Sequence, residues 1–135
     1  MYRLRCLLET DALLLGVERA TPADLRALKA AADECSEAAA TGDVAGQLAA
    51  NRRFHDRLHA LARSRPEARL LDILWDSTEA YRALYYVLPG AAAEADSAHR
   101  AIIAAVAARD AGRAVALQDA HREQALERLR DSLGA

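Results

Sequence analysis

Residues that favour β-strands are scarce in this sequence. Valine, isoleucine and threonine together occupy 12 positions, and aromatic residues make up 4% of the chain. Strands draw on these residue types, whereas the abundant alanine, leucine, arginine and glutamate favour helices. The 135 residues are enough for one domain with a real core and too few for two. We therefore predict an all-α fold, with one domain over residues 1–135.

The sequence also lacks a long apolar run and an excess of basic residues. Its longest apolar stretches, such as residues 101–108, are far shorter than the roughly 20 residues that span a bilayer. Glu9 and Asp11 interrupt any signal-peptide core near the start. The formal net charge of −2 provides no basic surface of the kind that a stand-alone nucleic-acid-binding protein needs. These features favour a cytoplasmic protein without a membrane segment.

Cysteine is rare as well. Cys6 and Cys35 are far apart in the chain, and their spacing matches no metal-ligand motif. Each is predicted to pack as a small apolar residue in a reducing compartment, and a redox or disulfide role is the alternative.

Apolar residues recur at helical spacing in six segments, which short breaks around Thr21-Pro22, Gly42, Pro66, Pro89-Gly90 and Asp110 separate. The predicted helices cover residues 2–19, 22–40, 43–62, 92–108 and 111–133, and a fourth helix in chain order has Pro66 in its first turn and ends at the break that begins with Val87. Because the joins are short, neighbouring helices should be antiparallel in a compact bundle.

The fourth helix has two features of interest. Its predicted buried row consists of Leu70, Leu74, Ser77, Tyr81 and Leu84, with Leu71 and Trp75 beside it. Its end gathers Tyr81, Arg82, Tyr85 and Tyr86. This group predicts either the lining of a polar cavity or a helix end with amphipathic side chains.

On the first helix, Arg5 and Glu9 stand one turn apart beside Ala12 and Gly16, on a narrow face of small residues. One interpretation is a surface ion pair. The other is that Arg5 faces a pocket and anchors an anion.

The third helix carries polar residues on its apolar face. Asn51 and His55 lie one turn apart on the stripe that includes Leu48 and Leu58. Burying an amide and an imidazole without partners costs on the order of 1–3 kcal/mol each, so an interior partner is expected. His59 lies on the shoulder of the same stripe and is predicted to border the site; chelation as an i, i+4 pair with His55 is the alternative.

Two further histidines face inward on later helices. His99 shares a stripe with Ile102 and Val106, and His121 lies near the edge of the apolar face of the last helix. Imidazole is a common ligand of zinc and related metals. Three inward histidines therefore indicate a shared metal site, with separately satisfied core histidines as the alternative.

Four motifs stand in a characteristic order. They are Arg5-Cys-Leu-Leu-Glu9, Asn51-x-x-Phe54-His55, Ala98-His99-x-x-Ile102-Ile103-x-Ala105-x-x-x-Arg109-Asp110 and Ala114-x-x-x-Gln118-x-x-His121. Together they resemble the C-terminal effector domain of GntR-type transcription regulators, the FadR C-terminal (FCD) fold. The resemblance covers nearly the whole chain and implies an antiparallel bundle of six or seven helices.

The resemblance also implies a site and a mechanism. A divalent metal, zinc or alternatively nickel, would be held at Asn51, His55, His99 and His121; the family usually has Asp at the first of these positions, and Asn brings no negative charge. A small organic acid would bind there, with the side chains of Arg5, Arg82 and Tyr85 as expected contacts.

Effector binding would then change the geometry of a homodimer. DNA would be bound only through an N-terminal winged-helix domain, which these residues do not include. The sequence is expected to be either an excised effector domain or a chain that naturally lacks its DNA-binding domain.

Two other functions stay open at this point. One is a small metal-dependent hydrolase-type enzyme, because three histidines with a vacant coordination position could activate water. No acidic residue stands beside the three histidines in the pattern as a general base, so we predict a protein that is not an enzyme. The other alternative is a metal-free helical dimerisation module, whose histidines bond to one another or to buried water.

Overall fold

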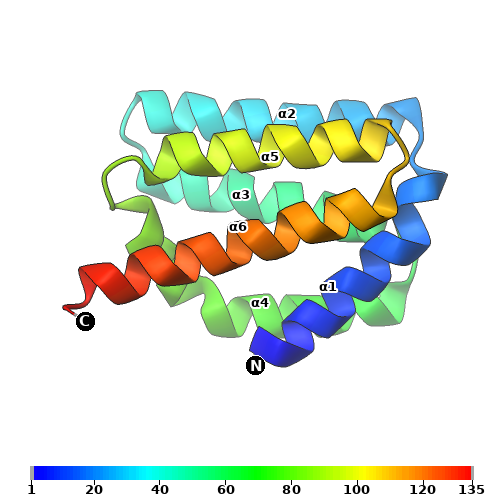
Figure 1. The fold of residues 1–135 in the computed structure, drawn as a ribbon. Helices are drawn as coiled ribbons and strands as arrows, with labels where there is room; N and C mark the ends of the chain where they lie inside the picture. Colours follow the sequence, from blue (N-terminus) through cyan, green and yellow to red (C-terminus); the bar gives the residue numbers. More distant parts are fainter. Residues whose placement is uncertain (1, 135) are drawn as a thin grey trace.

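A computed structural model describes residues 2–134 as a bundle of helices (Figure 1). Over these residues there are six α-helices, one short 3-10 helix and no strand, which confirms the predicted all-α class. The elements are α1 (Tyr2–Gly16), η1 (Val17–Arg19), α2 (Pro22–Ala40), α3 (Val44–Ala60), α4 (Arg65–Tyr86), α5 (Ala91–Ala107) and α6 (Ala111–Ser132). None of these helices is both long enough and apolar enough to cross a membrane.

The helices run back and forth along one axis of the bundle (Figure 1). α2, α3 and α5 pack together on one side, α1 and α4 pack together on the other, and α6 lies across both groups. Side chains from α1, α3, α4, α5 and α6 can therefore meet in the middle.

Side-chain caps set most of the helix starts. Thr21 and Asp24 form a capping box at the start of α2, with Pro22 in its first turn. Asp43, Ser64 and Asp110 each accept a hydrogen bond from the backbone N–H three residues later, at the starts of α3, α4 and α6.

The first predicted helix, residues 2–19, is shorter than expected. α1 ends at Gly16, and Val17–Arg19 form the separate 3-10 turn η1. At Gly16 the chain crosses the turn after α3 so closely that a Cβ atom would clash with the backbone of Leu61 and Ala62. A close crossing of this kind requires glycine, and glycine also weakens a helix.

The core contains two apolar clusters. One joins α1, α2, α3 and α5 through residues that include Leu13, Leu28, Phe54, Leu58 and Ile102. The other lies around Cys35, Tyr85, Tyr86, Ala95 and Leu129. Both cysteines are free thiols, and Cys35 packs in the core as predicted whereas Cys6 is half-buried.

The predicted buried row of α4 is wrong in part. Leu74, Leu71 and Trp75 are buried, but Leu70, Ser77, Tyr81 and Leu84 are exposed. The remaining inward positions are held by Thr78, Arg82, Tyr85 and Tyr86. A pattern that assigns apolar residues to the core predicts the wrong inward face for α4. This helix buries a guanidinium and a hydroxyl group and exposes leucines.

Candidate metal centre

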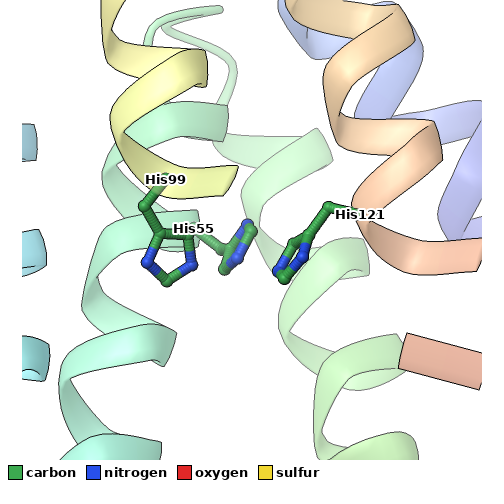
Figure 2. A group of neighbouring side chains, drawn as sticks. All are labelled: His55, His99 and His121. Carbon is green, nitrogen blue, oxygen red and sulfur yellow. The ribbon is translucent and has the colours of Figure 1, made fainter. Parts of the chain in front are cut away.

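Three histidines from three helices converge in the interior. His55 comes from α3, His99 from α5 and His121 from α6, and Figure 2 shows their imidazoles facing a common space. One ring nitrogen from each lies within 4.8 Å of the others. All three residues are at most 4% exposed. We call this group the histidine triad.

Aromatic packing fixes the orientation of the triad. The His99 ring stacks on Phe54 with 4.3 Å between centroids, and His55 packs against Trp75 at 4.9 Å. The rings of His55 and His121 are nearly parallel, with their centroids 6.1 Å apart. The local sequence explains this placement, since Phe54 directly precedes His55 on α3 and turns toward α5.

The triad is not satisfied by the protein itself. None of its six ring nitrogens has a hydrogen-bond partner among residues 2–134. The same is true of both amide atoms of Asn51, which is 1% exposed and one turn before His55. No hydrogen bond joins two of these histidines in the described part of the chain, which leaves buried water as the form of the metal-free alternative. Buried polar atoms without partners are costly, so this group is suited to an added ligand.

The electrostatic setting keeps the imidazoles neutral. Burial, followed by the positive charge of Arg82, lowers the pKa of His99 to about 3. Burial and neighbouring positive groups also hold the pKa values of His55 and His121 well below the usual 6.5. The neutral ring is the form that ligates metals.

The donor set therefore fits a divalent transition metal. Three imidazole nitrogens are typical ligands of zinc, nickel and related ions, and three protein ligands leave a coordination position open. The triad is positioned to bind such an ion. Asn51 has a free carbonyl oxygen close by in the sequence, one helical turn from His55, and this oxygen adds no charge.

A second buried polar group lies one helical turn away from the triad. At its centre Glu9 is 1% exposed, with Arg5 Nε at 2.6 Å from Oε1 and Arg122 Nη2 at 2.9 Å from Oε2. Gln118 donates to the same Oε2 and lies 3.1 Å from the Nε2 atom of His59. These five residues are called the Glu9 network below. His59 is engaged here and borders the triad without joining it, as predicted.

The Glu9 network shows that one of the two interpretations of Arg5 is wrong. It also contains buried polar residues that the sequence analysis did not identify. The Arg5–Glu9 pair is buried, so a surface ion pair is wrong, and Arg5 also donates to the Thr78 hydroxyl at 2.9 Å. Glu9, Gln118 and Arg122 were not identified as site residues. The available signals were the small-residue face around Glu9 and the position of Gln118 three residues before His121.

Arg82 and Tyr85 lie at the end of α4, beside a small cavity. The Nη1 atom of Arg82 is buried and has no acceptor among the described residues. The Tyr85 hydroxyl donates to the Ala91 carbonyl at 3.2 Å and is 3.3 Å from Glu94 Oε2. The cavity holds about 10 Å³, room for about one water molecule. It is lined by Tyr2, Tyr81, Arg82, Tyr85, Arg122, Ala125, Leu126 and Leu129.

The sequence profile of the FCD domain matches residues 1–124. The chain belongs to the FCD family. FCD domains occur in regulators of the GntR type and are regulatory rather than enzymatic. The resemblance inferred from the four motifs is therefore confirmed.

This FCD domain is also similar in fold to a solved structure. The structure of E. coli McbR/YncC superposes with a TM-score of 0.86 at 22% sequence identity. The match covers 98% of the present chain and 63% of that chain. The FCD domain thus spans less than two thirds of its neighbour, and the likeness shows a shared fold. A comparison with curated proteins gives no match.

Proposed function

We propose that this chain is the ligand-sensing and dimerisation domain of a GntR/FadR-type transcription regulator, acting as one unit over residues 1–135. It would bind a small organic acid at an interior divalent metal, with zinc as the first candidate and nickel as the second. The proposed ligands are Asn51, His55, His99 and His121. The main support is the set of six buried ring nitrogens that have no partner among residues 2–134.

The bound metal would supply a Lewis-acidic anchor for a carboxylate oxygen of the effector. Arg82 would hold the same ligand by charge, because its buried Nη1 has no acceptor in the described part of the chain. Arg5 would act beside it, although its Nε and Nη1 atoms already bind Glu9 and Thr78. Tyr85 would contribute its ring to the wall of the site, since its hydroxyl is engaged with Ala91.

The small volume of this cavity bears on how binding would become a signal. The cavity has room for about one water molecule, so an effector that entered it would move α1, α4 and α6 apart. Both α1 and α4 contribute polar residues to the interior. A movement of these helices would therefore also change the positions of the side chains on their outer faces.

Those outer faces support the proposed homodimer. α1 and α4 pack against each other, and each exposes large apolar side chains to solvent. We name these the apolar strip: Leu4, Leu7, Leu14, Leu15, Leu70, Ile73, Tyr81 and Leu84, each at least 43% exposed. Large apolar side chains exposed on two adjacent helices are a common feature of interaction sites. A second copy of the chain is the proposed occupant.

The output would be a change in DNA binding by a winged-helix domain, which these residues do not include. A regulator of this type would work in the cytoplasm. McbR/YncC is a GntR-family regulator of the same fold, which supports the assignment.

Metal analysis tests the proposed site. The purified protein is expected to bind one equivalent of zinc or nickel, and His55→Ala and His121→Ala should each lose it, because two imidazoles hold such an ion far more weakly than three. His59→Ala is the matched control and should bind metal like the parent. If both triad variants retain metal at the parental level, the ligand set is wrong.

The dimer is tested separately by light scattering coupled to gel filtration. Ile73→Asp in the apolar strip should convert the dimer into a monomer, because it buries a carboxylate in an apolar interface. Leu133→Asp is the control, since Leu133 is 71% exposed but lies outside the strip. A parent protein that is monomeric at high concentration would refute the dimer and leave the metal site standing.

A further inference from the structure

The interior around the triad carries an excess of positive charge. Three arginines with buried side chains, Arg5, Arg82 and Arg122, are at most 7% exposed. Among the described residues Glu9 is the one acidic residue that is buried, and it is shared by Arg5 and Arg122. Arg82 forms no ion pair within residues 2–134.

The nearby surface carboxylates do not remove this excess. Asp119 contacts Arg122 Nη1 at 2.9 Å, but its side chain is 45% exposed and screened by water. Glu94 lies close to Tyr85 and is already paired with Arg128 at 2.7 Å. Neither is bonded to Arg82.

Two arginines that line one cavity each have a buried N–H group without an acceptor among the described residues. Arg82 Nη1 and Arg122 Nε have no hydrogen-bond acceptor among the described residues, and both arginines line the cavity between α1, α4 and α6. The other walls are the rings of Tyr2, Tyr81 and Tyr85 and the side chains of Leu126 and Leu129. The site therefore offers positive donors and apolar walls, which suits an anion with a carbon skeleton.

The residue at position 51 increases the imbalance. Asparagine is neutral, so a divalent ion held by Asn51 and the triad would keep both of its charges, whereas an aspartate ligand would cancel one. In a poorly hydrated interior, uncompensated charges of one sign are unfavourable until an opposite charge enters.

We propose that the effector of this chain carries two negative charges, and that the site prefers a dicarboxylate to a monocarboxylate of the same size and shape. One carboxylate would face the metal and the other would face Arg82 and Arg122. This inference rests on the proposed effector site and adds the charge of the ligand to it.

Matched pairs of acids provide the test. The zinc-loaded protein is titrated at pH 7.5 by calorimetry with succinate, glutarate and phthalate, and with the monoamide of each, while the zinc content is monitored. Each monoamide keeps the size of its diacid and lacks one charge. For every pair that binds, the diacid is expected to bind about tenfold more tightly or better.

Two variants connect the preference to the residues. Asn51→Asp restores a negative ligand with almost no change of shape and should reduce the preference for the diacid to a few-fold. Arg82→Gln should also reduce it, by weakening the diacid more than the monoamide. Arg53→Gln is the control, because Arg53 is 46% exposed and pairs with Glu34 outside the site. Thermal unfolding without ligand establishes that each variant is folded; if Arg82→Gln is not, Asn51→Asp decides.

The outcomes separate this inference from the function it rests on. Equal affinity for diacids and monoamides, or an unchanged preference in a folded Asn51→Asp, would overturn the dianion and leave the metal-bound effector site intact. Zinc binding without any binding of the six acids would also overturn it. Absence of both zinc binding and acid binding would refute the proposed function itself.

Discussion

The histidine triad and the Glu9 network lie one helical turn apart, yet they differ in whether their polar atoms have hydrogen-bond partners. α3 supplies His55 to one and His59 to the other, and α6 supplies His121 and Gln118 in the same way. In the network, both oxygens of Glu9 accept charged or amide hydrogen bonds. In the triad, all ring nitrogens are without partners among residues 2–134. The network stabilises the bundle, whereas the triad keeps its capacity for a ligand.

The largest effect is expected from breaking the Glu9 network. Glu9→Ala leaves the buried guanidinium groups of Arg5 and Arg122 without their carboxylate, and removal of one partner of a buried pair costs about 3–5 kcal/mol. Urea unfolding of the metal-free protein measures the loss. Glu34→Ala removes an exposed carboxylate that pairs with Arg53 and should cost less than about 1 kcal/mol. Similar losses in the two variants would mean that the network is not structural.

As the pH is lowered, the triad histidines should reduce the stability of the fold at a higher pH than Glu9 does. Histidine in the unfolded chain has a pKa near 6.5, whereas burial lowers the pKa of His99 to about 3 and also lowers those of His55 and His121. Below pH 6.5 the unfolded chain gains protons that the folded, metal-free chain does not. The free energy of unfolding therefore decreases as the pH is lowered, by up to about 1.4 kcal/mol per pH unit for each histidine.

Glu9 follows in a lower pH range. Burial alone would raise its pKa, but His59 when protonated, together with Arg5 and Arg122, outweighs burial and holds the pKa at about 2. Its contribution is complete above about pH 4.5, the unfolded value, and is lost between pH 4.5 and 2. Unfolding measured between pH 6.5 and 4.5 therefore reports on histidines. The slope should be smaller in His99→Leu, and an unchanged slope would contradict the assignment.

Replacing a triad histidine should have opposite effects with and without metal. In the metal-free protein, His99→Leu removes unsatisfied polar atoms and should raise the free energy of unfolding by about 1–2 kcal/mol. With zinc present, the same variant loses the stabilisation that the metal gives the parent. His59→Leu is the paired comparison, and it should be destabilising in both conditions because it breaks the contact with Gln118. Destabilisation by His99→Leu without metal would show that the triad is satisfied.

The smallest effect is expected at the residue that touches both groups. The Trp75 ring lies 4.1 Å from the Arg5 guanidinium and 4.9 Å from the His55 ring. Trp75→Phe keeps an aromatic ring but weakens the cation–π contact, at a cost of about 1 kcal/mol. Circular dichroism follows the unfolding, because this is the single tryptophan in the chain. No loss at all would mean that neither the cation–π contact nor the larger indole ring contributes to stability.

The sequence predicts the helices and the triad because both depend on local periodicity. Caps such as Thr21 and Asp110 mark helix starts directly. His55, His99 and His121 each fall on an apolar stripe, and a stripe identifies an inward side chain without knowledge of its neighbours. Convergence of the three histidines then follows from packing the stripes together.

The Glu9 network and the facing of α4 could not be predicted in this way, because they depend on contacts between distant segments. Arg82 and Thr78 are inward although a polarity pattern assigns them to the surface, and the side-chain partner of Thr78 is Arg5, 73 positions earlier. Glu9 is satisfied by residues more than 100 positions later. Leu70 and Leu84 were assigned to the core because apolar side chains are usually buried, whereas here they remain on the surface.

The close crossing at Gly16 has a mechanical consequence. Because its backbone rests directly on the turn after α3, this end of α1 would act as the fulcrum of a lever whose arm extends over 14 residues to Tyr2 beside the cavity. At about 1.5 Å per residue the arm is about 21 Å long, so a tilt of about 5° at the fulcrum displaces its tip by about 2 Å. Any residue larger than glycine at position 16 would push this end of α1 away from Leu61 and Ala62. It would thereby change how far Tyr2 moves when α1 tilts, even though position 16 lies far from the cavity.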